Sequence, residues 1–95
     1  MQFEWDDKKN QLNQKKHGID FAAAALVFLD RDRIEAIDGR KEYGEVRYQT
    51  IGVVNNNLLY IVYTKREENY RIISARRANR DEREAYLYHR QITER

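Results

Sequence analysis

The chain begins with a mainly polar stretch and a short apolar segment, continues with strand-like runs and ends in a stretch whose capping pattern indicates a helix. Runs rich in β-branched and aromatic residues, as strands are, occupy residues 33–37, 45–54, 58–66 and 70–76. The linkers 55–57 and 67–69 are short enough to be antiparallel hairpin loops. The apolar alternation slips between Tyr48 and Ile51, which predicts a β-bulge near Gly52.

The region before these strands begins with a short apolar segment and a polar helix. Residues 3–5 form either an opening strand or a packed N-terminal hook. Asp6 or Asp7 can cap the first helix, which ends near His17. Gly18 follows at the position where a left-handed residue closes a helix.

Two further helices are predicted, one before and one after the strands. Asp20 caps the helix over 21–29, which is apolar on all sides and is therefore either wrapped by the fold or covered by a partner. The closing helix, 79–93, begins at Asn79, and Glu82 three residues later completes a capping-box pattern. We therefore expect an α+β domain with two N-terminal helices, an antiparallel sheet of about four strands and one C-terminal helix.

Composition narrows the class of protein further. The 95 residues are 41% hydrophobic and 36% charged, so residues 1–95 are expected to fold as one globular domain. Cysteine is absent and the two histidines lie 72 positions apart, which favours neither a disulfide framework nor a metal site, so we expect no cofactor. No apolar run is long enough to span a membrane, and Met1 leads directly into charged residues. A cytoplasmic protein is the natural expectation.

Positive charge is concentrated at the end of the chain. Residues 71–95 hold seven arginines and four acidic residues, whereas residues 1–70 hold eleven basic and twelve acidic residues. Such a local excess favours an anionic partner on one face, although solvated helix surface explains part of it.

The junction between the last predicted strand and the last predicted helix contains the arginines that point most clearly to a function. Arg76 ends a predicted strand, so its backbone is rigid, and a guanidinium fork there suits a phosphate group. The alternative is a structural ion pair with Glu82 or another carboxylate. Arg77, Arg80 and Arg83 are read as ordinary surface at the start of the helix.

Three groups of residues, in order and at matching spacing, resemble the signatures of the BrnT-type toxins. The first comprises Phe3, Glu4, Trp5, Asp6, Lys9, Asn13, Lys16, His17, Gly18 and Phe21. The second comprises residues 44–48 with Ile51 and Gly52, and the third comprises residues 71–76 with Ala78, Glu82, Arg83 and Tyr86. The resemblance covers nearly the whole chain, from residue 3 to about residue 88.

This resemblance implies a RelE-like fold and a toxin of a bacterial type II toxin–antitoxin pair. Toxins of that wider group are metal-independent endoribonucleases that stop translation by cutting RNA. The implied partner is a BrnA-like antitoxin with a ribbon-helix-helix domain, and the pair would bind operator DNA only through the antitoxin.

Cutting RNA without a metal requires a base for the 2′-hydroxyl, cations for the extra charge on phosphorus and an acid for the leaving 5′ oxygen. Arg76 is the first candidate for the cation and Arg47 the second. His17 can act as acid or base because histidine is the side chain that ordinarily exchanges a proton near neutral pH, and Glu45 can act as base if it shares a strand face with Arg47. The alternatives are an exposed sheet face for Arg47 and a helix-terminal, dipole-stabilised histidine for His17.

Lys9, Lys16 and Tyr86 are the candidate RNA-binding residues. The two lysines lie on one helix face with Asn13, and they either hold phosphates or are a solvated surface. Tyr86 either stacks on a base or packs in the core. Two other functions stay open: a non-catalytic nucleic-acid- or protein-binding module, and a degenerate toxin that retains only antitoxin binding.

Overall fold

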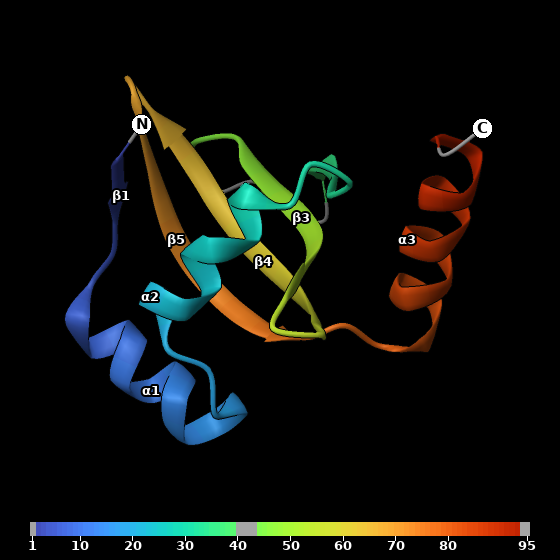
Figure 1. Cartoon of the computed structure of the whole chain (residues 1–95). Helices are drawn as coiled ribbons and strands as arrows, with labels where there is room; N and C mark the ends of the chain where they lie inside the picture. The colour runs from blue at the N-terminus through green and yellow to red at the C-terminus, as the bar shows by residue number, and fades with distance from the viewer. Residues whose placement is uncertain (1, 40–43, 94–95) are drawn as a thin grey trace.

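The computed structural model describes residues 2–39 and 44–93, which form one five-stranded sheet and helices on both sides of it (Figure 1). In chain order the elements are β1 (Gln2–Glu4), α1 (Asp7–His17), α2 (Phe21–Ala24), the 3₁₀ helix η1 (Ala25–Leu29), β2 (Ile34–Asp38), β3 (Arg47–Val54), β4 (Asn57–Arg66), β5 (Asn69–Arg77) and α3 (Arg80–Thr93). The predicted α+β class and the order of the helices are confirmed.

The sheet differs from the expected antiparallel sheet of about four strands in one respect. Its strand order is β1-β5-β4-β3-β2, and the N-terminal segment supplies the fifth strand, β1, which runs parallel to β5. The other three pairings are antiparallel, as predicted. The sequence left residues 3–5 open between an opening strand and a packed hook, and the pairing with β5 shows that the strand is correct.

The predicted helix ends are confirmed by their caps. Asp6 accepts hydrogen bonds from the backbone N–H groups at positions 8 and 9, and Gly18 adopts φ +71° at the end of α1. Asp20 caps α2, and Asn79 and Glu82 form the reciprocal capping box. The helix expected over 21–29 is correct in place, but its second half tightens into the 3₁₀ helix η1.

Each face of the sheet has its own apolar cluster. The cluster beneath α1, α2 and η1 includes Phe21, Val27, Ile61, Tyr63 and Ile72. The smaller cluster beneath α3 includes Ile51, Tyr60, Val62, Ala78 and Tyr86. Figure 1 shows α2 crossing in front of the sheet and α3 standing beyond β3. We call the side of the sheet that packs against α3 the α3 face.

The β-bulge lies in a different strand from the one predicted. The pairing of β3 with β4 is regular through Gly52, whereas β5 shifts register against β4 between Val62 and Tyr63, leaving Ile73 as the extra residue. Gly52 is required for another reason. A Cβ there would lie 2.8 Å from Cγ1 of Val27, so η1 can pack on β3 only over a glycine.

Candidate functional site

Three arginines from two strands lie on the α3 face. Arg47 pairs with Thr64, Arg71 pairs with Thr64 from the other side, and Arg76 pairs with Tyr60, four residues along β4 from Thr64. Residues an even number of positions apart share a strand face. Arg71 and Arg76 are an odd number apart, so they would point to opposite faces of a regular strand. The bulge at Ile73 corrects this phase and brings both to one side.

Arg47 and Arg71 belong to a polar row that crosses the whole sheet. In register order the row is Asp38, Arg47, Thr64, Arg71 and Glu4, with one residue from each strand. Arg71 Nη1 donates to Glu4 Oε2 at 2.9 Å. Thr64 is fully buried, and its Oγ1 has no hydrogen-bond partner in the part of the chain that the structure describes. A buried hydroxyl left unsatisfied between two arginines is unusual enough to mark a candidate anion site.

Arg76 sits at the other end of this face in a well-defined environment. Its guanidinium lies 4.0 Å from the ring centroid of Tyr60, a cation–π contact. Nη1 and Nη2 each donate to a different carboxylate oxygen of Glu82, both at 2.8 Å. Glu82 Oε1 also accepts from the backbone N–H of Asn79 at 2.8 Å. The ion pair with Glu82, which the sequence left as the alternative for Arg76, is therefore present, with the side chain of Arg76 33% exposed.

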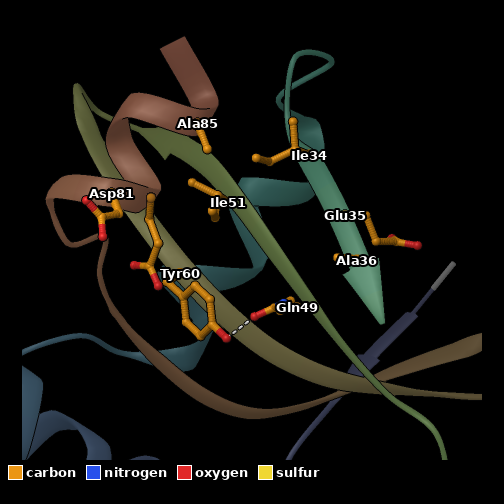
Figure 2. Close-up of a pocket in the computed structure, with 9 residues that line it drawn as sticks. Ile34, Glu35, Ala36, Gln49, Ile51, Tyr60, Asp81 and Ala85 are labelled. Carbon is orange, nitrogen blue, oxygen red and sulfur yellow. Dashed lines mark hydrogen bonds between the residues drawn. The ribbon is translucent and has the colours of Figure 1, made fainter. Parts of the chain in front are cut away.

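A pocket of about 330 Å³ opens beside Arg76, between α3 and the sheet. Its lining consists of Ile34, Glu35, Ala36, Gln49, Ile51, Tyr60, Asp81, Glu82 and Ala85. Tyr60 donates a hydrogen bond to Oε1 of Gln49 across the floor (Figure 2). Ala85 points toward the pocket from α3, Asp81 lies at its edge on the first turn of α3, and the side chain of Glu35 points away from it (Figure 2). Tyr60 and Glu82 thus contact both the pocket and Arg76.

Glu45 and His17 are not placed as the sequence suggested. Glu45 precedes β3, which starts at Arg47, so the two do not share a strand face; its Oε1 accepts from Arg66 Nη2 at 3.2 Å. His17 ends α1, one helical turn after the buried Asn13, and is half-buried. Among the described residues, its side chain makes no hydrogen bond or ion pair that joins it to the arginines of the α3 face.

Asn13, rather than the lysines beside it, explains how α1 is held. Its amide group donates to the carbonyl of Ala75 at 2.8 Å and accepts from the N–H of Ala75 at 3.1 Å, so it acts as a short piece of strand on the outer edge of β5. It also donates to the carbonyl of Ile19 at 3.0 Å. Lys9 and Lys16 are exposed on α1. They stay candidates for RNA binding, although at the sheet edge rather than on the α3 face.

Tyr86 is only 2% exposed, and its hydroxyl donates to Oδ2 of Asp30 at 2.6 Å. This position does not favour the stacking role predicted for it. Burial and the hydrogen bond to the carboxylate both raise the pKa of the Tyr86 hydroxyl. Tyr86 is therefore a structural link between α3 and the segment after η1.

The opposite face of the sheet carries a separate charged cluster. Glu35 accepts hydrogen bonds from Tyr63, from Lys65 at 3.1 Å and from Arg33 at 3.1 Å. Burial alone would raise the pKa of Glu35, but these donors lower it below its ordinary value. A carboxylate held ionised by three donors is a poor proton acceptor, so we infer that this cluster stabilises the fold and takes no part in proton transfer.

Sequence reasoning missed four residues of the α3 face: Arg71, Thr64, Tyr60 and Gln49. Each lies in a predicted strand, but their common side depends on pairing register and on the bulge at Ile73. Alternation within β3 and β4 could have grouped Arg47 with Gln49 and Tyr60 with Thr64. Nothing in the sequence alone joins either pair to Arg71.

The fold and this site define a small α+β domain whose sheet presents an arginine-lined face beside a pocket. The family comparison is more specific: the family described as "Ribonuclease toxin, BrnT, of type II toxin-antitoxin system" matches residues 5–82. This match covers well over half of the 95 residues, and the chain belongs to the BrnT family of ribonuclease toxins. No curated protein matches the chain. Among the described residues, no helix is long and apolar enough to cross a membrane.

Proposed function

We propose that this BrnT-family toxin is a metal-independent endoribonuclease that binds RNA on the α3 face and arrests translation by cutting it. The observation that carries the proposal is the placement of Arg47, Arg71 and Arg76 on one side of the sheet, in a chain of the ribonuclease toxin family. Guanidinium forks on paired strands are rigid, and they offer bidentate hydrogen bonds to phosphate oxygens.

The three arginines fall into two groups, which contact different phosphates of the bound RNA. The row of Arg47, Thr64 and Arg71 lies four residues of β4 from Arg76, which is roughly 13 Å. In their observed positions the two groups therefore contact different phosphates. Arg76 stabilises the charge that develops on phosphorus at the cleaved bond, and Arg47 with Arg71 holds the strand nearby.

The proton transfers are assigned to Glu45 and His17. Removal of the 2′ proton lets that oxygen attack the adjacent phosphorus, and the P–O5′ bond breaks as the 5′ oxygen takes up a proton. The products are a 2′,3′-cyclic phosphate and a 5′-hydroxyl, so no metal or external oxidant enters the balance. Glu45 is the candidate for the base and His17 is the candidate for the acid. Glu45 lies two residues before Arg47 and His17 ends α1, so each must come within hydrogen-bond reach of the phosphodiester that Arg76 holds.

The antitoxin belongs to the same proposal. The family is that of type II toxin–antitoxin systems, so a cognate antitoxin is expected. We propose the BrnA-like type with a ribbon-helix-helix domain, which would also carry any contact with operator DNA. Leu26 and Leu29 on η1 are 47% and 81% exposed, and they are candidates for its docking surface.

The experiment is cleavage of a defined RNA by purified, antitoxin-free protein in EDTA, followed by mass spectrometry of the RNA ends. Cyclic phosphate ends are expected, and Arg76→Ala should lower the rate by about 10²–10³-fold. Arg80→Ala is the matched control, because Arg80 is 84% exposed and pairs with Glu84, four residues along the same helix, at 3.3 Å. Intact RNA over a broad range of conditions would contradict the proposal.

A growth assay tests the biological role separately. Induction of the toxin alone should arrest bacterial growth, and co-expression of the cognate antitoxin should restore it. Normal growth of cells that express folded toxin would rule the role out.

The bidentate pair between Arg76 and Glu82 supports a second candidate, a non-catalytic nucleic-acid-binding module. In that case the ion pair is purely structural. RNA binding would fall steeply with salt, and no cyclic phosphate ends would form.

A further inference from the structure

Two residues that line the pocket between α3 and the sheet, Tyr60 and Glu82, also contact Arg76. The ring of Tyr60 borders the pocket and supports the guanidinium of Arg76 at 4.0 Å, and Glu82 lines the pocket while holding both terminal nitrogens of the same guanidinium. A molecule seated in the pocket therefore ends beside Arg76. If that molecule carries a phosphate, the phosphate lies within reach of the cation.

The lining of the pocket suits a flat, partly polar ring. Ile34, Ala36 and Ile51 make the floor apolar, and Ala85 closes the side toward α3. A volume of about 330 Å³ accommodates a nucleobase with part of its sugar. Apolar walls with a few polar groups are the usual composition of a pocket that binds a small aromatic ligand.

The polar groups of the pocket include a hydrogen-bond donor and a hydrogen-bond acceptor. Gln49 uses its Oε1 to accept from Tyr60, which leaves its NH₂ group to donate. Asp81 is exposed at the edge of the pocket, in the first turn of α3, and its carboxylate only accepts hydrogen bonds when ionised. Carboxylates repel a phosphate but accept from the exocyclic amino groups of bases, as Asp and Glu do from the N4 amino group of cytosine.

We propose that this pocket binds one nucleobase of the RNA, with preference for a base that carries an amino group, and places the adjoining phosphate on Arg76. The inference rests on the proposed function, because it supplies the base specificity of the same site. Gln49 and Asp81 are the specificity-determining residues. Cytosine is preferred over uracil because its amino group donates to Asp81, where uracil offers only a carbonyl.

A protein segment is the competing occupant of any open pocket with an apolar floor. Two observations favour the nucleotide. Asp81 and Glu82 lie on the α3 side of the pocket and the cation Arg76 lies next to Glu82, so the charges match a base with an amino group followed by a phosphate. The pocket also lies on the same sheet face as the other two arginines.

The test measures binding without relying on catalysis. The free toxin, labelled with ¹⁵N, is titrated with 3′-CMP, 3′-UMP and inorganic phosphate, and the backbone and side-chain amides are followed by NMR. We expect 3′-CMP to shift the NH₂ group of Gln49 and the amide of Ala85. One hydrogen bond of ordinary net strength makes its affinity about fivefold higher than that of 3′-UMP. Inorganic phosphate should shift Arg76 but not Ala85.

Two variants and a matched control sharpen the result. Ala36→Leu fills the pocket and should abolish the shifts, whereas Ala22→Leu, at an exposed position of α2 outside the lining, should leave them unchanged. Asp81→Asn replaces the carboxylate with an amide of the same size, and it should bring the affinity ratio of the two nucleotides close to one. Retained NMR spectra of each variant report whether it folds.

Each outcome has one meaning. If neither nucleotide shifts the pocket amides, the inference is wrong, even if the toxin cuts RNA. If both bind equally well, the recognition by Asp81 is wrong. If the antitoxin alone shifts the pocket amides, a protein segment is the occupant. If 3′-CMP binds as expected but no RNA is cut, the pocket inference stands and the proposed ribonuclease function fails.

Discussion

Tyr86 on α3 donates a 2.6 Å hydrogen bond to Asp30, a residue 56 positions earlier that follows η1. The same carboxylate oxygen of Asp30 accepts from the backbone N–H of Val53 in β3 at 2.9 Å. One carboxylate therefore joins the helix of the α3 face to the sheet and to the segment that covers the opposite face. The shape of the pocket depends on this link, because α3 provides one of its walls.

Replacement of Tyr86 by Phe should destabilise the protein without removing the chemistry. The variant loses a hydrogen bond to a charged acceptor, which costs about 1.5–3 kcal/mol in free energy of unfolding. Urea unfolding measures the loss, and RNA cleavage by the folded fraction should persist. Tyr88→Phe is the control, since Tyr88 is 66% exposed. A variant as stable as wild type but unable to cut RNA would instead support the RNA-binding role that the sequence left open for Tyr86.

Acid should weaken the fold through Asp30 and Glu35. Burial tends to raise the pKa of each, but hydrogen bonds from Tyr86 and backbone N–H groups to Asp30, and from Tyr63, Lys65 and Arg33 to Glu35, lower them below 3.8 and 4.5 respectively. A carboxylate with a lowered folded-state pKa adds stability above its ordinary pKa, and that stability is lost as the pH falls through the folded-state value.

The free energy of unfolding should therefore decline below about pH 5 and continue to fall below the ordinary pKa values of both groups. Urea unfolding at several pH values measures the decline. Asp30→Asn should be less stable than wild type near neutral pH and should show a shallower decline in acid. An equally steep decline in the variant would place the acid sensitivity elsewhere.

Replacement of Glu82 by Gln separates the two readings of Arg76. Gln can keep the capping box with Asn79 but removes the charge that holds Arg76. If Arg76 binds phosphate, RNA affinity should rise by about fivefold, which corresponds to roughly 1 kcal/mol of released ion pairing. Fluorescence anisotropy with a labelled RNA measures the affinity, and Glu84→Gln is the exposed control. Unchanged or weaker binding would assign the ion pair a purely structural role.

Replacement of Gly52 by Ala should disturb the contact between η1 and β3. Its Cβ would lie 2.8 Å from Val27 Cγ1 and 3.1 Å from Arg33 Cβ, so the packing must shift, at a cost of about 1–3 kcal/mol. Gly39→Ala is the control, because a Cβ there meets nothing within 4 Å. Thermal or urea unfolding measures both, and equal stability of the two variants would contradict the tight contact at Gly52.

Local signals in the sequence were sufficient to predict the helices and the four longer strands. Asp6, Gly18, Asp20 and the pair Asn79 and Glu82 act as the predicted caps, because capping depends on residues within a few positions of each other. The hairpin loops could be predicted for the same reason. For β1 the local signals left a strand and a packed hook open, because three residues take their structure only from pairing with β5.

The sequence by itself determined the α+β class, the helix ends and the family resemblance, and it singled out Arg76 and Arg47 as candidate cations. Which side of the sheet each arginine occupies was decided by the tertiary structure. Arg71 and Arg76 are an odd number of positions apart, and only the bulge at Ile73, against Val62, puts them on one face. Strand alternation is local, but the register that sets its phase comes from pairing and packing between distant segments.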